Sequence, residues 1–165
     1  MLNIINVSPI IGNHFRTLRE DTSVLSLILL FLLFPGLLSG LAVYFNVTIV
    51  DLVISPLIAS FSIFIGFTIN VLILLLKMEK EKERVKNKLL KHLSYNALYE
   101  LILGLFVLIM SLIIALLHSH IYNEINIILN FILFFMMINF FFTLLIIAKR
   151  IFVIFQIKIK EGGTD

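Results

Sequence analysis

The chain has 165 residues, a hydrophobic content of 61% and a mean hydropathy of +1.12. Soluble globular domains average about 45–50% apolar residues, so this composition excludes an ordinary soluble domain. The chain has no cysteine, which excludes a disulfide framework and thiolate catalysis. The formal net charge of +3 does not indicate nucleic-acid binding, because membrane orientation accounts for the basic residues.

Residues 1–23 form a short polar lead before the first apolar run. Ser8-Pro9 is typical of a helix start, with a capping hydroxyl followed by proline at the first helical position. This lead predicts an amphipathic helix lying on the inner leaflet, and an ordinary loop is the alternative. The apolar residues that recur at helical spacing are Ile11, Phe15 and Leu18.

Residues 24–148 contain four long apolar runs. A helix needs about 20 apolar residues to cross a hydrocarbon core of about 30 Å, and each run is long enough. The first run is too long for a signal-peptide core, so we expect it to remain as a membrane helix. Pro35 predicts a kink within it. We therefore predict an all-α bundle of four transmembrane helices, at 24–45, 52–76, 93–117 and 125–148.

The basic residues predict the orientation of this bundle. All 13 Lys and Arg residues lie in the lead, in the segment 77–92 and in the tail 149–165, whereas the connections 46–51 and 118–124 hold none. Cytoplasmic loops are rich in Lys and Arg, so we predict that both termini lie in the cytoplasm. Within the tail, residues 151–159 are apolar and are expected at the inner interface.

The segment 77–92 is the only sizeable soluble piece that the sequence predicts. Acidic and basic residues at i,i+3 spacing support a helix, so we expect the second span to continue past the membrane and turn near Asn87. The simplest interpretation is a solvated stalk, and the alternatives are contact with anionic lipid or docking of a cytoplasmic protein. The basic residues available for such contacts are Lys80, Lys82, Arg84, Lys86 and Lys88.

Polar side chains inside the spans are the main candidates for function. Glu100 is the only acid well inside a span, about 10 Å deep at 1.5 Å per residue. Asn70 and Thr143 lie at a similar distance from the cytoplasmic ends of their spans, and Asn96 shares a helix face with Glu100. Charges and amides are costly in hydrocarbon, so we predict that these residues form one functional polar layer.

Small residues form stripes around this layer. Small residues allow close approach of helices in lipid. We interpret the stripes as an inward-facing seam that packs the bundle, or as a water-accessible path within one subunit or between copies. The packing residues are Gly36, Gly40, Ala59, Ser62, Gly66 and Gly104, with Ser55 and Asn70 extending the stripe of the second span.

Asn130 and Asn139 predict a homo-oligomer. They point about 180° apart on the fourth span, so they cannot both face one seam. An amide facing lipid would be unsatisfied, so we expect one of them to face the bundle and the other a second subunit.

Catalytic and metal-binding signals are weak or missing. His118, His120 and Glu124 could bind a metal, but surface histidines without a metal are the simpler interpretation. The sequence has no Walker A, Rossmann, HExxH, GxSxG or GxGD motif. We therefore predict a protein that is not an enzyme and binds no cofactor.

Two short segments resemble a known family. The segment 13–19, NHFRTLR, and the segment 62–75, SIFIGFTINVLILL, resemble an uncharacterised family of small bacterial four-span proteins. Members have a similar HFxTLR-type lead and a glycine–asparagine pattern in the second span, and some accompany phage-defence genes. The resemblance implies a membrane component of a bacterial defence or stress system, and it singles out Gly66 and Asn70.

Four functions remain open from the sequence. The first is an oligomeric effector that alters ion permeability, and the second is an anchor that recruits a cytoplasmic partner through 77–92. The third is a proton-coupled exporter using Glu100, although aromatic residues near it are scarce apart from Tyr95 and Tyr99. The fourth is an immunity protein against a membrane-active toxin.

Overall fold

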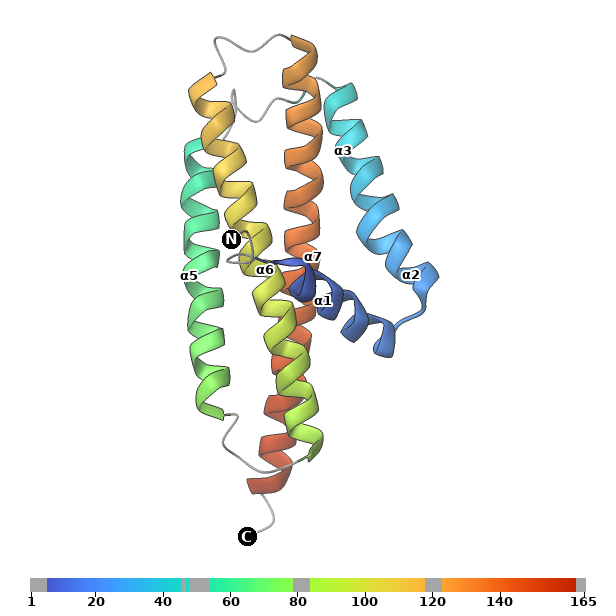
Figure 1. Cartoon of the computed structure of the whole chain (residues 1–165), viewed down its shortest axis with the longest axis vertical. Helices are drawn as coiled ribbons and strands as arrows, with labels where there is room; N and C mark the ends of the chain where they lie inside the picture. The colour runs from blue at the N-terminus through green and yellow to red at the C-terminus, as the bar shows by residue number, and fades with distance from the viewer. Residues whose placement is uncertain (1–5, 46, 48–53, 79–83, 118–122, 163–165) are drawn as a thin grey trace.

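The protein is described by a computed structural model for residues 6–45, 47, 54–78, 84–117 and 123–162. In these ranges all secondary structure is helical, as predicted. Figure 1 shows α5, α6 and α7 as three long helices, with the first span beside α7 and α1 crossing the bundle obliquely. In chain order the elements are α1 (Ser8–Asp21), α2 (Val24–Ile28), η1 (Leu29–Leu33), α3 (Phe34–Tyr44), α5 (Ile54–Met78), α6 (Arg84–Leu117) and α7 (Asn123–Gly162).

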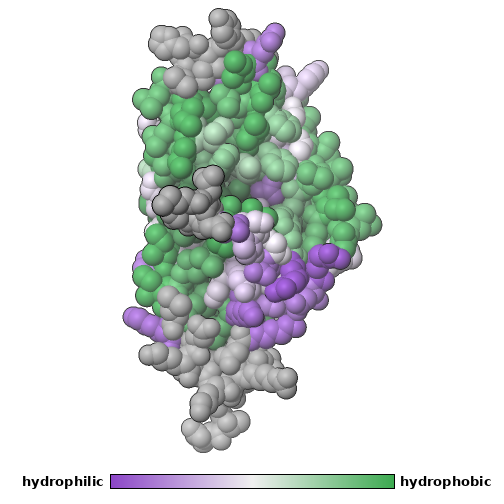
Figure 2. Space-filling model, viewed as in Figure 1, coloured by the Kyte–Doolittle hydropathy of each residue, from purple (hydrophilic) through white to green (hydrophobic). Residues whose placement is uncertain are grey.

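Four helices of the described chain are long and apolar enough to cross a membrane, which confirms the predicted fold class. Their apolar stretches are 21, 22, 29 and 34 residues long. Figure 2 shows that the visible face of the bundle is mostly apolar, with hydrophilic residues gathered where α1 ends. The exposed apolar side chains run along all four helices, as expected for a surface in contact with lipid.

The first span is irregular just before Pro35. Proline has no N–H to donate to the carbonyl four residues back, so the regular helix is interrupted there. The residues Leu29–Leu33 form a π-helical turn, and the N–H of Phe34 bonds to the carbonyl of Leu29, five residues back. A π-helical turn therefore accommodates the proline, and the α-helix resumes at Phe34.

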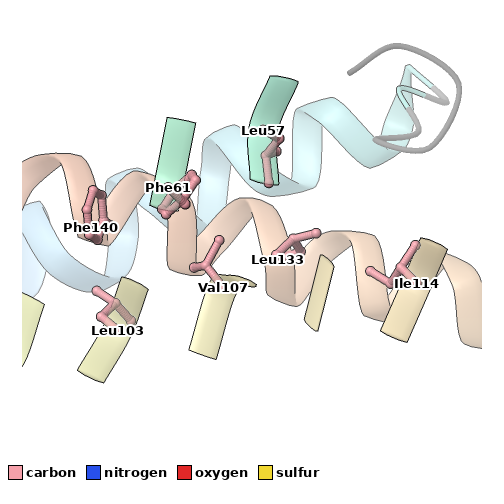
Figure 3. Close-up of a cluster of buried hydrophobic side chains, with 7 residues drawn as sticks. All are labelled: Leu57, Phe61, Leu103, Val107, Ile114, Leu133 and Phe140. Carbon is pink, nitrogen blue, oxygen red and sulfur yellow. The ribbon is translucent and has the colours of Figure 1, made fainter. Parts of the chain in front are cut away.

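Large apolar side chains fill the space between α5, α6 and α7. Figure 3 shows this cluster, in which the rings of Phe61 and Phe140 lie 4.7 Å apart between centroids. A second cluster continues the core toward the 79–83 connection. The first cluster consists of Leu57, Phe61, Leu103, Val107, Ile114, Leu133 and Phe140.

The structure contradicts the predicted turn near Asn87 and shows that the last helix continues beyond 148. α5 ends at Met78 and α6 begins at Arg84, so Asn87 lies inside α6 and is not a turn. The charge pairs of 77–92 support helix wherever they fall, and they cannot locate the turn. The apolar part of the tail is helical and continues the fourth span, because α7 runs without a break to Gly162. No proline or glycine occurs between residues 125 and 160 to end this helix.

The two amides of α7 do not indicate a second subunit. Asn130 and Asn139 are both buried, with 2% and 4% exposed. α7 packs against α6 and also against α3, so two different faces of this helix are covered within one chain. The Asn139 amide donates to the carbonyl of Phe135, and the Asn130 amide donates to Asn126. The argument for an oligomer from these two residues is therefore wrong.

Candidate functional site

Three of the four side chains predicted to form a polar layer are buried. Asn96 and Glu100 on α6 and Thr143 on α7 each expose at most 1% of their surface. The Thr143 hydroxyl donates to the carbonyl of Asn139 at 2.9 Å, so it is satisfied within its own helix. Asn96 and Glu100 are one helical turn apart, but they face different surroundings.

Asn70 does not join this layer, because the α5 stripe lies on the outside of the bundle. Its members Ser55, Ala59, Ser62, Gly66 and Asn70 are all exposed. The prediction of an inward-facing seam is therefore wrong for α5. Its buried face instead carries large residues such as Phe61, together with the Thr68 hydroxyl. These side chains fill the space against α6 and α7, which small residues would leave empty.

The predicted packing glycines behave differently from one another. A Cβ built on Gly104 would lie 2.9 Å from Cε2 of the Phe140 ring, so this glycine is required for close packing of α6 on α7. At Gly36, Gly40 and Gly66 a Cβ would meet nothing within 4 Å. The G-x-x-x-G of the first span is therefore not used for close helix contact within one chain.

A buried polar cluster joins α1 to α6, and the sequence did not predict it. The His14 ring is fully buried and stacks on Tyr99, with centroids 3.9 Å apart and planes 13° apart. His14 Nδ1 lies 3.1 Å from Oδ1 of Asn96, and the Thr17 hydroxyl lies 3.2 Å from the same oxygen. The only sequence signal was the spacing of His14 and Thr17, which sets both on the face of α1 that also carries Leu18.

The surroundings of His14 keep its ring neutral. Burial lowers the pKa of His14 from 6.5 to about 4, the hydrogen bond to Asn96 acts against this, and the charge of Arg150 adds to it. Because the Asn96 Oδ1 can only accept, the proton of the neutral ring lies on Nδ1. The His14 Nε2 and the Asn96 Nδ2 have no partner within the described chain.

Ion pairs hold the C-terminal end of α1 against α6 and α7. Arg150 is 6% exposed, and its Nη2 donates to the Thr17 carbonyl at 3.3 Å and to the Asp21 carboxylate at 2.8 Å. Glu20 accepts from Lys88 Nζ at 2.7 Å, and this hydrogen bond lowers the pKa of Glu20. The predicted amphipathic helix is therefore present, but its buried face contacts protein.

The Glu100 carboxyl lies at the floor of an apolar groove. The groove has a volume of about 420 Å³ and runs between α5 and α7, with Glu100 contributed by α6. The Thr68 hydroxyl lies beside the carboxyl, and Glu100 Oε1 is buried without a hydrogen-bond partner in the described chain. The remaining lining residues are apolar: Phe67, Leu144, Ile147, Ala148, Ile151, Phe152 and Phe155.

The basic residues predicted for partner contact are mostly not described. Lys80 and Lys82 lie outside the described residues, and Arg84 and Lys86 lie in α6 with side chains that are not described. Lys88 is exposed but pairs with Glu20. The described residues contain no group of three His, Cys, Asp or Glu side chains that could hold a metal. His118 and His120 fall outside that part of the chain, while Glu124 is exposed at the start of α7.

No family model, curated protein or solved structure matches this chain. Its assignment therefore depends on the four apolar helices and the largely apolar surface. The chain is a small multi-pass membrane protein. The Glu100 groove and the buried His14–Asn96 cluster are two polar sites within the described chain.

Proposed function

We propose that this protein is an oligomeric membrane component that changes ion permeability without catalysis, and that the permeation path lies between copies of the chain. The observation that supports this proposal is the placement of Glu100. Its carboxyl is buried and lacks a partner on Oε1, and it lines a groove that opens on the lipid-facing side of α5 and α7. An intramembrane acid in such a position is a functional candidate by default.

A path inside one subunit is disfavoured by the packing of the core. The space between α5, α6 and α7 is occupied by Phe61, Phe140 and other large side chains of the first cluster. A protein interior packed at this density has no room for a column of water. Any path that uses Glu100 must therefore run along the outer face of the bundle.

The outer face of α5 supports contact between copies. Asn70 is exposed, one turn along α5 from Phe67 at the edge of the Glu100 groove, and its amide has no hydrogen bond in the described chain. An amide exposed to hydrocarbon would be unsatisfied, and a second copy could supply its partner. Gly66 has open space around it, so another helix can approach closely.

Two measurements test this proposal. We expect purified protein in liposomes to carry ion flux, and Glu100→Gln to change it. Because the chain has no cysteine, we also expect Gly66→Cys to form disulfide-linked dimers under oxidation, whereas Leu145→Cys, which is 61% exposed on α7, should not. Equal cross-linking at both positions would contradict the proposal. So would the same ion flux in Glu100→Gln as in the unsubstituted protein.

A second candidate function is proton-coupled carriage of a lipophilic cation. The groove brings Phe67, Phe152 and Phe155 to Glu100, so the expectation that few aromatic residues lie near this acid is wrong. Their proximity to Glu100 could not be predicted from the sequence, because two of the rings come from the part of α7 that continues beyond Arg150. Aromatic faces and a carboxylate both attract organic cations. Uptake of tetraphenylphosphonium driven by a pH gradient, and lost in Glu100→Gln, would favour this function over ion conduction.

We further propose the bacterial inner membrane as the location, with both termini in the cytoplasm. Arg150 contacts Asp21, and Lys88 contacts Glu20. These contacts support the placement of the lead, the segment 77–92 and the tail on the same side of the membrane. Labelling of single cysteines placed in the lead and the tail, from either side of the membrane, would test this orientation. A role in defence rests on the resemblance of 13–19 and 62–75 alone. Challenging cells with phage, with and without the gene, would test it.

A further inference from the structure

A second cavity lies where α1, the first span and α7 meet. It has a volume of about 510 Å³. Its polar end is formed by Asp21 and Thr22 at the end of α1 and by Lys149 and Arg150 of α7. Its other lining residues are apolar and include Leu30 of the first span. The cavity therefore has one polar and one apolar part, at the height where the apolar run of α7 meets its first basic residues.

Arg150 lines this cavity, and one nitrogen of its guanidinium has no hydrogen-bond partner in the described chain. Its Nη2 bonds to Thr17 and Asp21, but its Nη1 is buried and has no partner within the described chain. A buried donor on a charged group is costly when it is left unpaired. Lys149 is exposed at the same polar end. Lys149 and Arg150 against Asp21 leave one net positive charge among the lining residues.

We propose that this cavity binds the headgroup phosphate of an anionic phospholipid. Phosphate oxygens accept from guanidinium and ammonium groups, so they match the Arg150 guanidinium and the Lys149 ammonium that line the cavity. The apolar side, including Leu30, then contacts the upper part of an acyl chain. Basic pockets between membrane helices at this height are suited to anionic lipid heads. The site is separate from the Glu100 groove and does not depend on ion conduction.

The absence of tryptophan from the chain allows a direct test in vesicles. Leu30→Trp places a single fluorophore at the cavity, and Ile63→Trp places one on the exposed face of α5, where Ile63 is 72% exposed. Brominated phosphatidylglycerol and brominated phosphatidylcholine are compared as quenchers at equal fractions of the bilayer. We expect phosphatidylglycerol to quench the Leu30→Trp protein several-fold more effectively, and the two lipids to quench the Ile63→Trp protein equally.

Reversing the charge of Lys149 tests whether this residue produces the preference for phosphatidylglycerol over phosphatidylcholine. Lys149→Glu in the Leu30→Trp protein should reduce the preference for phosphatidylglycerol by at least about fivefold, since each basic group near the surface contributes about that factor. Lys91→Glu is the matched control, because Lys91 is exposed on α6 and does not line the cavity. Equal quenching by both lipids at Leu30→Trp, or the same loss in both charge variants, would overturn the proposal. Displacement of the lipid by millimolar inorganic phosphate would also overturn it, because the site would then be one for a free anion.

Discussion

Lowering the pH from 7 to 5 should loosen α1 from the bundle. The His14 ring is neutral where α1 is docked, with a pKa of about 4, and it returns toward 6.5 when α1 is released to water. The undocked state therefore binds more protons between these two values, and the docked state loses stability as the pH falls through this window. The loss is about 2 kcal/mol at pH 5, which is roughly a twentyfold rise in the opening constant relative to pH 7.

Hydrogen exchange of the α1 amides measures this opening. The protein is held in nanodiscs, and exchange rates are corrected for the intrinsic effect of pH. His92 also faces α1 and lies 3.6 Å from Glu20, so the experiment uses a His92→Gln background in which His14 is the titrating imidazole at this contact.

His14→Gln provides the control for this experiment. Glutamine does not titrate, so this variant should open more readily than the parent at pH 7 but change little on acidification. A parent opening constant that rises less than about threefold at pH 5 would refute the reasoning. So would an equal pH response in the glutamine variant, because the proton would then act elsewhere.

Two further substitutions test the packing. Gly104→Ala should destabilise the protein by about 1–3 kcal/mol, because the new methyl group meets the buried Phe140 ring. Gly66→Ala, with open space around it, should be neutral or stabilising by up to about 1 kcal/mol. Thermal unfolding in detergent compares the two, and equal melting temperatures would contradict the packing argument. Asp21→Asn should weaken α1 docking by about 1–2 kcal/mol, because Arg150 stays buried with less compensation. Unchanged protection of the α1 amides would count against it.

The sequence was sufficient to predict the four apolar helices because each is defined by length and hydropathy alone. It also predicted that α1 is amphipathic, and that Asn96, Glu100 and Gly104 share a buried face of α6. These features depend on the periodicity of a single helix. Local patterns of this kind do not require knowledge of which helices are neighbours.

The predictions failed where they required knowledge of which helices pack against one another. The periodicity of the small residues on α5 defines one face of the helix, but it does not say whether that face is buried. The opposite face is buried, because Phe61 fills the space against α6 and α7. The lead that contains His14 was predicted to lie on the inner leaflet, but His14 is buried beside Asn96, which comes 82 residues later in the chain. The groove at Glu100 exists because α7 continues past Arg150. The basic residues at 149 and 150 had led us to end the fourth span at residue 148.

α7 continues well beyond the point where its apolar run ends. The run from 125 to 148 is about 36 Å long at 1.5 Å per residue, so it fits a hydrocarbon core of about 30 Å at a tilt of roughly 35°. The helix then continues past Lys149 and Arg150 to Gly162. This continuation carries Phe152 and Phe155, which are 59% and 60% exposed and line the same groove as Glu100. A change in membrane thickness would therefore act on the lipid around these rings, and so on access to the Glu100 carboxyl.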